Sequence, residues 1–512
     1  MKLLFVIPLI GILLLTLLLG SRMIIAQDFF FLADQARDFL LVQDIVVNKN
    51  ITLIGTHSGL GGFFHGPLWL YLLMPFYILG GGDPFAFTYA YVLIAIITVL
   101  AGFLIGNSLY GRKAGFLLAL LLGVSPSIWM YIPNTIGVNV IPLVLLVLFY
   151  FLLRYLHGKQ YAFIGAAFFV GLSLQFETAL PLILIPIVFV SFFLNKKAIT
   201  NVKVILGSLV AFVLSLATFI LFEVRHNFLM TNSLITIFTS GKREQGYLEI
   251  PERLLSHLQS MRGVYESILV TRSVFLELLL VAIFIAFIVY TIKLRLYKKR
   301  EWKDCLYLLL FPVCVFVLYT GYAYPVFPEY LLGLTVPVAL AAVLIFRYLW
   351  RTRVGKVLVI LFLGLTILET GKLLYSNYLL PYQQNMTSGS YQNQQVVARW
   401  IMNDSKGKPF GYFVYTPSTF TYGMDYLLWW EAKQAAMATP TSTKKETTYL
   451  ILYPPLENDK GAHAFWKKYK IKTAGKVITR KEFTGGIIVE KLAIDPKEEP
   501  ADPTYNQELL FR

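Results

Sequence analysis

The chain of 512 residues contains repeated apolar runs that are long enough to cross the roughly 30 Å hydrocarbon core of a bilayer. Hydrophobic residues make up 57% of the chain and charged residues only 14%, whereas soluble domains carry about 25% charged residues. The sequence therefore predicts an all-α polytopic membrane domain with about eleven transmembrane helices. The runs cover residues 3–20, 85–109, 114–132, 137–153, 161–176, 179–194, 202–222, 273–292, 304–321, 330–346 and 355–373.

Two apolar stretches near the N-terminus need separate interpretation. The first run follows a single Lys2 and lacks a small-residue cleavage signature, so we expect a retained helix with residue 1 in the cytoplasm. The stretch from Pro67 to Leu79 reaches only about 20 Å as a helix, and Pro75 interrupts it. We therefore expect a juxtamembrane helix that lies at the interface or re-enters the membrane.

The net charge of +16 is explained by orientation in the membrane. With eleven spans, every compact basic cluster falls on the side of residue 1, as the positive-inside rule requires, and the membrane lipids are its expected contacts. We predict no nucleic-acid partner. Most acidic residues of the membrane portion fall on the other side, so we expect function on the outer face, in the long loops 21–84 and 223–272. The basic clusters are Arg112 with Lys113, Arg154 with Lys159, Lys196 with Lys197, Lys293 to Lys303, and Arg347 to Lys356.

After residue 373 the composition becomes that of a small soluble domain. We expect a membrane domain over residues 1–373, an extracytoplasmic α/β domain over 374–494 and a disordered tail over 495–512, which is rich in Pro, Glu and Asp. Cys305 and Cys314 lie inside one apolar run, which excludes a disulfide framework. In the α/β domain the pattern predicts helices at 391–404, 424–434 and 461–470 and strands at 411–415, 449–453 and 487–491.

Asp34, Arg37 and Asp38 follow the first span and share one face of a helix, because spacings of three and four residues are about one turn. A carboxylate beside a guanidinium at a membrane surface can accept a proton from a hydroxyl while the guanidinium holds a phosphate through paired donors. The alternative is an interfacial helix with an ordinary exposed ion pair. The same loop ends with Phe63-Phe64-His65-Gly66-Pro67-Leu68, a polar hinge before the short apolar helix.

In this order of features, residues 1–350 resemble the GT-C superfamily of polytopic glycosyltransferases. The similarity is to the family 39 group, which includes the dolichyl-phosphate-mannose protein mannosyltransferases and bacterial enzymes that move sugars from polyprenyl phosphates. The resemblance implies a multi-pass glycosyltransferase of the cell membrane. It would transfer a sugar, with inversion, from a polyprenyl-phosphate donor to a lipid, glycan or protein acceptor on the outer face.

The resemblance also implies roles for individual residues. Asp34 matches the catalytic base, and Arg37 matches a contact of the lipid phosphate. His65 lies where relatives place a metal-binding or polar residue, so His65 and His226 are candidate ligands of a divalent metal, with ordinary hydrogen-bonding histidines as the alternative. The candidate catalytic residues are Asp34, Glu177 and Glu223; the candidate substrate-binding residues are Arg37, Asp38, His65, Asn139, Arg225, His226 and Glu329.

Three positions depart from the family pattern. Gln35 replaces a second acid, Gly66 replaces a lysine, and Asn139 replaces an aspartate of a later outer loop. Glu177 and Glu223 are expected to substitute as acids and Arg225 as the phosphate clamp.

Two other classes of function stay open. A lipid-linked sugar flippase or solute transporter would usually carry broken helices and polar residues at mid-membrane, whereas the polar residues here concentrate in the outer loops. The three departures also fit an envelope interaction protein that has lost its chemistry.

Overall fold

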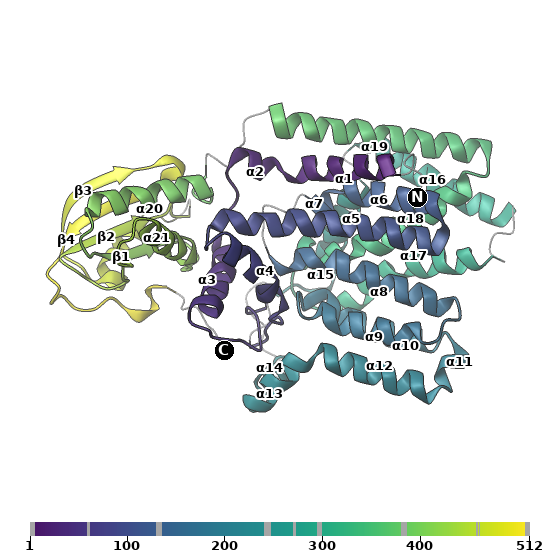
Figure 1. The fold of residues 1–512 in the computed structure, drawn as a ribbon, viewed down its shortest axis with the longest axis horizontal. Coiled ribbons are helices and arrows are strands. Elements are labelled where there is room, and N and C mark those ends of the chain that lie inside the picture. The colour runs from purple at the N-terminus through teal and green to yellow at the C-terminus, as the bar shows by residue number, and fades with distance from the viewer. Residues whose placement is uncertain are drawn as a thin grey trace.

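The computed structural model shows a long helical bundle with a small α/β domain at one end (Figure 1). It describes residues 6–58, 62–129, 136–239, 247–269, 273–293, 299–379, 387–456, 459 and 461–506. The helices of the bundle are α1 (Val6–Gly20), α5 (Thr88–Tyr110), α6 (Arg112–Val124), α7 (Pro126–Trp129), α8 (Ile141–Leu156), α9 (Ala162–Ser173), α10 (Ala179–Phe192), α11 (Lys196–Ile199), α12 (Val202–Ser215), α13 (Ala217–Arg225), α16 (Val274–Lys293), α17 (Arg300–Tyr319), α18 (Thr335–Leu349) and α19 (Arg353–Leu379).

Each of the eleven apolar runs is largely helical in its described part; residues 3–5 and 130–132 of two runs lie outside that part. Six helices of the described chain are long and apolar enough to cross a membrane, and a seventh is added if α12 and α13, bent by 63°, form one span. The helices α1, α6, α9 and α10 are shorter. The structure thus has the several apolar helices of a multi-pass membrane protein, and the count of eleven spans stays a prediction.

Helix α18 lies at the centre of the bundle. All of its residues except Arg347 are buried, which fits a helix that is hydrophobic all round. By contrast, α16 exposes apolar side chains such as Phe275, 76% exposed, as a lipid-facing helix does. The runs of the sequence therefore divide into core helices and peripheral helices.

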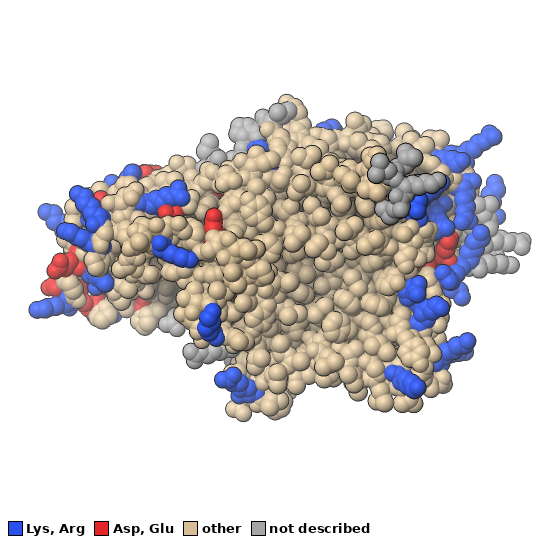
Figure 2. Space-filling model, viewed as in Figure 1, with Lys and Arg blue, Asp and Glu red and all other residues tan. Residues whose placement is uncertain are grey.

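Basic side chains gather at the end of the bundle that is remote from the α/β domain (Figure 2). There Arg347 forms an ion pair with Glu301 at 3.3 Å and donates to the carbonyl oxygen of Tyr110 at 2.9 Å. At the same end, His157 Nε2 lies 2.7 Å from Asp304 Oδ2. The ends of α5, α8, α17 and α18 are thus tied together, and α1 runs from this end toward the α/β domain (Figure 1).

A second set of helices and turns covers the end of the bundle that faces the α/β domain. The short stretch 67–79 forms a helix of 12 residues that contains Pro75. These elements are α2 (Arg22–Ala26), α3 (Ala33–Val47), α4 (Leu68–Leu79), α14 (Leu229–Thr239), α15 (Ile250–Leu269) and the 3₁₀ turns η2 (Pro84–Phe87), η3 (Gly137–Val140) and η5 (Pro328–Leu334).

The α/β domain holds one sheet of four strands in the order β1-β2-β4-β3, in which β1 and β2 are parallel and the other pairs antiparallel. The three predicted strands and three predicted helices are present within a few residues of their expected bounds. Strand β3 was not predicted: all seven of its residues are exposed, so it lacks the buried face that marks a strand in a sequence. The elements are α20 (Tyr391–Ser405), β1 (Gly411–Tyr415), α21 (Tyr422–Gln434), β2 (Thr447–Leu452), α22 (Ala462–Phe465) continued by a π-helix (Trp466–Ile471), β3 (Lys476–Glu482) and β4 (Ile488–Ala493).

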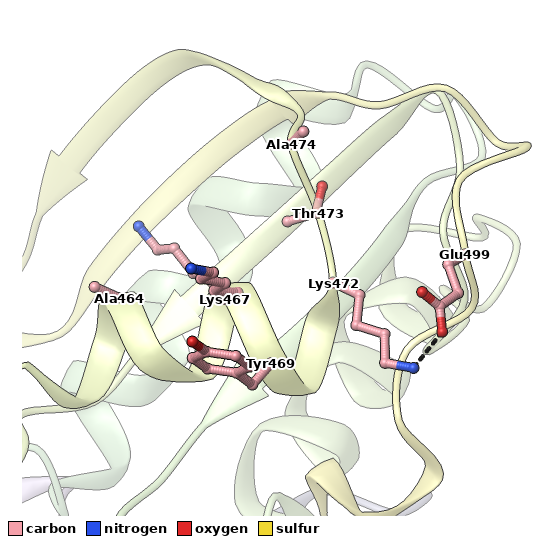
Figure 3. A pocket seen from close by; sticks show the side chains of 8 residues that line it. Ala464, Lys467, Tyr469, Lys472, Thr473, Ala474 and Glu499 are labelled. Carbon is pink, nitrogen blue, oxygen red and sulfur yellow. Dashed lines mark hydrogen bonds and ion pairs between the residues drawn. The ribbon is translucent and has the colours of Figure 1, made fainter.

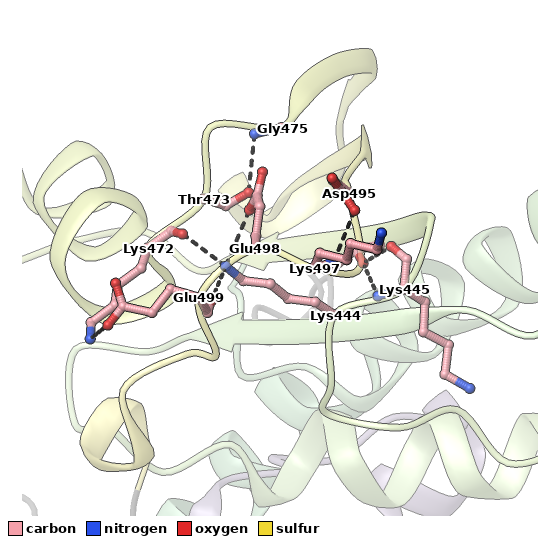
Figure 4. Close-up of polar contacts among 10 residues, drawn as sticks. Lys444, Lys445, Lys472, Thr473, Gly475, Asp495, Lys497, Glu498 and Glu499 are labelled. Atoms are coloured by element: carbon pink, nitrogen blue, oxygen red, sulfur yellow. Dashed lines mark hydrogen bonds and ion pairs between the residues drawn. The ribbon is translucent and has the colours of Figure 1, made fainter.

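The structure differs from the predicted disordered tail at residues 495–506. Lys444 Nζ donates to a carboxylate oxygen of Glu498 at 3.2 Å and also bonds the backbone carbonyl of Glu499 (Figure 4). The ring of Tyr505 packs edge-on against Phe413, with centroids 5.3 Å apart. Acids of this segment thus pair with lysines elsewhere in the domain. Composition alone cannot predict such pairs, because they join distant parts of the chain. Residues 507–512 lie outside the described residues.

The α/β domain docks on the loop that precedes α3. The buried carboxylate of Asp28 accepts hydrogen bonds from Ser390 Oγ at 2.9 Å and from the backbone N–H of Gln392 at 3.1 Å, and so caps α20. Burial raises the pKa of Asp28. Around this contact the rings of Phe31, Phe39 and Tyr426 meet with centroids 5.7 to 6.3 Å apart. Rings from both domains therefore share one core.

We expect Phe39→Ala to destabilise the whole protein. Phe39 is fully buried and its ring stacks on Phe87 at 3.8 Å, so the truncation leaves a cavity between the two domains. A loss of about 3–5 kcal/mol is usual for a buried phenylalanine. Thermal unfolding of the purified protein in detergent measures the effect. Phe275→Ala, at an exposed ring of α16, is the matched control, and equal unfolding midpoints for the two variants would contradict the shared core.

Candidate active site

A cavity of about 580 Å³ lies at the end of the bundle that faces the α/β domain. Its wall is formed by the segment between α1 and α5, by the loops before α8, α10 and α18, and by the start of α21. Its lining residues are Ala33, Asp34, Arg37, Asp38, Gly55, Thr56, His57, Ser58, His65, Gly66, Trp69, Leu70, Ile136, Gly137, Val138, Phe176, Glu177, Glu329, Tyr330, Phe420 and Tyr422.

The guanidinium of Arg37 lies between two carboxylates of different character. Arg37 Nη1 lies 2.9 Å from Asp34 Oδ1, and Nη2 lies 3.3 Å from Asp38 Oδ1. The side chain of Asp34 is 65% exposed and that of Asp38 only 2%. The predicted helix face is therefore present in α3, with one acid open to the cavity and one held beneath the arginine.

Asp38 is held from a second side as well. The indole Nε1 of Trp69 donates to Asp38 Oδ2 at 2.8 Å, which connects α3 to α4. Burial raises the pKa of Asp38 to about 6, although the Arg37 charge and the Trp69 hydrogen bond both act to lower it. Asp38 thus orients Arg37 and α4, and its pairing with Trp69 was not predicted.

The hinge around His65 pairs with residues earlier in the same loop. The backbone N–H of His65 donates to Thr56 O at 2.9 Å, and the N–H of Gly55 donates to His65 O at 2.8 Å. Burial lowers the pKa of His65, the nearby Glu177 raises it and Arg37 lowers it further. Its Nδ1 is buried and has no hydrogen-bond partner among the described residues. A neutral imidazole with a spare nitrogen therefore lines the cavity.

Gly66 lies against the segment before α10. A Cβ at this position would lie 2.1 Å from Gln175 Oε1 and 2.6 Å from Gln175 Cα. Gln175 is itself held, since its Nε2 donates to Ser215 O at 2.9 Å. Any larger side chain at position 66, including a lysine, would therefore collide with Gln175.

Two further predicted acids line the cavity. Glu177 Oε1 accepts from the backbone N–H groups of Thr178 at 2.8 Å and Ala179 at 3.0 Å, so this carboxylate also caps α10. Glu329 lies in η5. Among the described residues of the lining, these two acids, Asp34 and Asp38 supply four carboxylates, and Arg37 supplies one guanidinium.

The structure places four of the predicted site residues outside the cavity lining. Glu223 caps α14, because its carboxylate accepts from the N–H groups of Met230 at 2.8 Å and Thr231 at 3.0 Å. His226 lies 2.8 Å from the carbonyl oxygen of Phe222 through Nδ1 and stacks on that ring. The other two are Arg225, which is exposed at the end of α13, and Asn139, which lies in η3 beside the lining residues Gly137 and Val138.

The structure does not bring His65 and His226 together in the cavity lining. In the part of the chain that the structure describes, no group of three or more His, Cys, Asp and Glu side chains is placed to hold a metal ion. The proposed histidine pair therefore gains no third ligand from the described residues.

A second, more open hollow of about 710 Å³ lies on the α/β domain, around the π-helix (Figure 3). Lysines dominate its wall, but two of them are engaged: Lys472 pairs with Glu499, and Lys467 pairs with Glu490. The first of these ion pairs holds the segment 495–506 against the domain, and the second joins the π-helix to β4. The cavity at α3, by contrast, combines a carboxylate and a guanidinium with a polar wall in the manner that the sequence predicted.

The bundle, the helices that cover one of its ends and the appended α/β domain together form a fold that is shared with solved structures. The crystal structure of ArnT from Cupriavidus metallidurans in the apo state superimposes with a TM-score of 0.61, covering 95% of this chain and 97% of ArnT at 12% sequence identity. The structure of the same protein bound to undecaprenyl phosphate gives a TM-score of 0.60, covering 96% of this chain and 98% of that one at 11% identity. No protein-family model and no curated protein matches the chain.

We expect Asp38→Asn to change how stability depends on pH. The folded-state pKa of Asp38, about 6, lies above its ordinary 3.8, so its stabilising contribution is full below about pH 4 and is lost as pH rises through about 6. Asparagine keeps an acceptor for Trp69 and has no charge to bury. The unfolding midpoint of the variant relative to the unmodified protein should therefore rise between pH 4 and 6. Asp495→Asn, at an exposed carboxylate, is the control; parallel profiles would rule out the raised pKa.

We also expect Gly66→Ala to lower the unfolding midpoint. The added methyl group would collide with the backbone and side chain of Gln175, and overpacking of this kind costs about 1–3 kcal/mol. Gly364→Ala in α19 is the control, because its Cβ would meet nothing within 4 Å. Thermal unfolding of both variants in detergent measures the difference. If Gly66→Ala is as stable as the control, the close approach is not present.

Proposed function

We propose that this protein is a membrane glycosyltransferase that moves a sugar from a polyprenyl-phosphate donor to an acceptor. The observation that carries the proposal is the Asp34–Arg37 pair, which lies in a cavity at one end of a GT-C-like bundle. The ArnT structure bound to undecaprenyl phosphate supports a lipid of this chemistry, because it has the same fold over nearly the whole chain. In this proposal the basic end of the bundle faces the cytoplasm, and the cavity and the α/β domain lie outside.

Arg37 is proposed as the contact of the donor phosphate. A guanidinium presents several N–H donors in a plane and binds phosphate oxygens in pairs, and its charge stabilises the phosphate as it leaves. Asp38 is a positioning residue in this scheme. It is buried, it bonds Arg37 and Trp69, and it keeps the guanidinium directed toward the cavity.

Asp34 is proposed as the general base. The acceptor hydroxyl oxygen attacks the anomeric carbon of the sugar, the bond from that carbon to the phosphate oxygen breaks, and the hydroxyl proton passes to Asp34. The polyprenyl phosphate departs with the bonding electrons. Attack opposite the leaving group inverts the anomeric centre. The open carboxylate of Asp34, 65% exposed, is available to an acceptor in a way that the buried Asp38 is not.

His65, Glu177 and Glu329 are proposed to bind substrate hydroxyl groups. Each lines the same cavity as Asp34, and the Nδ1 of His65 is a buried nitrogen without a hydrogen-bond partner in the described chain. Glu223, Arg225 and His226 have no role in this scheme because they lie outside the lining.

Binding of undecaprenyl phosphate to the purified full chain in lipid nanodiscs tests the roles of Arg37 and Asp34 separately. Arg37→Ala should weaken binding about tenfold or more, since it removes charged hydrogen bonds to the phosphate. Asp34→Asn should bind at least as well, because it removes a negative charge beside the phosphate, yet lose about 10²–10⁴ of the transfer rate. Arg262→Ala is the matched control, at an exposed arginine that also pairs with two carboxylates, Glu266 and Glu277.

Transfer is measured with a panel of undecaprenyl-phosphate sugars and an envelope extract as the source of acceptors. If Arg37→Ala binds undecaprenyl phosphate as tightly as the unmodified protein, the phosphate role of Arg37 is wrong. If Asp34→Asn keeps the full transfer rate, Asp34 is not the general base. Movement of the sugar lipid across the bilayer without any transfer would instead identify a flippase.

A further inference from the structure

Two aromatic side chains of the α/β domain line the cavity that otherwise belongs to the membrane domain. Phe420 lies in the loop before α21 and Tyr422 is the first residue of that helix. Their ring centroids lie 5.5 Å apart at an interplanar angle of 39°. They share the cavity with Asp34 and Arg37, and the charges of both residues act on the pKa of Tyr422, which burial raises. The rings thus lie near the proposed reacting groups.

The loop that carries these rings is fixed by its own hydrogen bonds. Thr416 Oγ1 donates to the carbonyl oxygen of Phe420 at 3.0 Å, and Thr421 Oγ1 donates to Asp425 Oδ2 at 2.6 Å. Asp425 also accepts from the hydroxyl of Tyr412 at 2.9 Å. Thr419 has φ of +61°, a left-handed conformation that a β-branched residue adopts only where its surroundings enforce it. The position of Phe420 is therefore imposed by the loop.

Helix α21 is in turn fixed to the membrane domain. The hydroxyl of the buried Tyr426 donates to Gly82 O at 2.7 Å, and Lys433 Nζ donates to Gly81 O at the far end of the helix. The neighbouring helix α20 is fixed as well, because Gln394 Nε2 donates to Phe31 O at 2.8 Å, just before α3. Tyr422 and Asp34 therefore lie on two helices, α21 and α3, that are packed against each other through Phe39 and Tyr426.

We infer that Phe420 and Tyr422 form the wall of the donor-sugar subsite, so that the α/β domain selects the sugar. This inference rests on the proposed function. The donor's anomeric carbon is bonded to the phosphate that Arg37 is proposed to hold, so the sugar ring must occupy the same cavity next to that residue. One face of a sugar ring is a row of C–H groups, which pack on an aromatic face, while its hydroxyl groups need polar partners at the edge. The cavity supplies both, because carboxylates and His65 line it together with the two rings.

Binding of two kinds of probe to the full chain in nanodiscs tests the inference. The first probe is undecaprenyl phosphate, and the second is a panel of undecaprenyl-phosphate-linked hexoses, pentoses and amino sugars. We expect at least one sugar lipid to bind more tightly than undecaprenyl phosphate. Phe420→Ala and Tyr422→Ala should each reduce that gain about five- to tenfold and leave undecaprenyl phosphate binding unchanged. Tyr422→Phe, which keeps the ring, should retain most of it.

The controls separate this inference from the proposed function. Phe465→Ala removes a 60% exposed ring elsewhere on the same domain and should change neither probe. Arg37→Ala should weaken both probes equally. Suppose that Arg37→Ala weakens both probes, but Phe420→Ala and Tyr422→Ala still bind the sugar lipid more tightly than undecaprenyl phosphate by the full factor. The aromatic subsite is then wrong, and the proposed phosphate site is kept. A panel in which no sugar lipid exceeds undecaprenyl phosphate also overturns the subsite. If neither probe binds, or Arg37→Ala changes nothing, the proposed function itself fails.

Discussion

The geometry of the cavity depends on one buried charge. Asp38 lies beneath Arg37 with almost no exposure, and it holds the guanidinium on one side and the indole of Trp69 on the other. A carboxylate buried in this way is unfavourable unless partners satisfy it, so α3 and α4 must keep their relative placement for the carboxylate to be tolerated. Arg37 is thereby directed toward Asp34 and the cavity. A charged side chain keeps a precise position in a site when other residues hold it by hydrogen bonds and packing, as Asp38 holds Arg37.

Much of the architecture could be predicted because it follows from hydrophobic periodicity. The apolar runs form helices in their described parts, and basic side chains gather at one end of the bundle (Figure 2). In the α/β domain the buried strands β1, β2 and β4 were found, since their apolar residues mark them. Strand β3 was missed because every residue of it is exposed, and residues 495–506 were missed because ion pairs between distant parts of the chain order them.

The candidate site could be predicted where it is local in sequence. Asp34, Arg37 and Asp38 are one helical turn apart, so their common face required no tertiary information. Glu223, Arg225 and His226 were grouped with them by order along the chain, whereas a capping contact fixes Glu223 at α14 instead. The sequence did not mark Trp69, Phe420 or Tyr422 as site residues, because aromatic residues are common in apolar helices and in loops. The two α/β-domain rings lie more than 380 residues beyond Asp34 in the chain, and only the fold brings them to the cavity.

The aromatic core shared by the two domains has a consequence for how this protein can be divided. Phe31 and Phe39 come from the N-terminal part and Tyr426 from the C-terminal part, yet they fill a single interior. A cut at the composition change near residue 373 would expose apolar surface on both pieces. It would also separate the start of α20 from Asp28, which accepts from the N–H of Gln392. The α/β domain is therefore not an independent module that could be exchanged between proteins on its own. Any exchange of the α/β domain between proteins would have to include the loop 21–32, which carries Asp28 and Phe31.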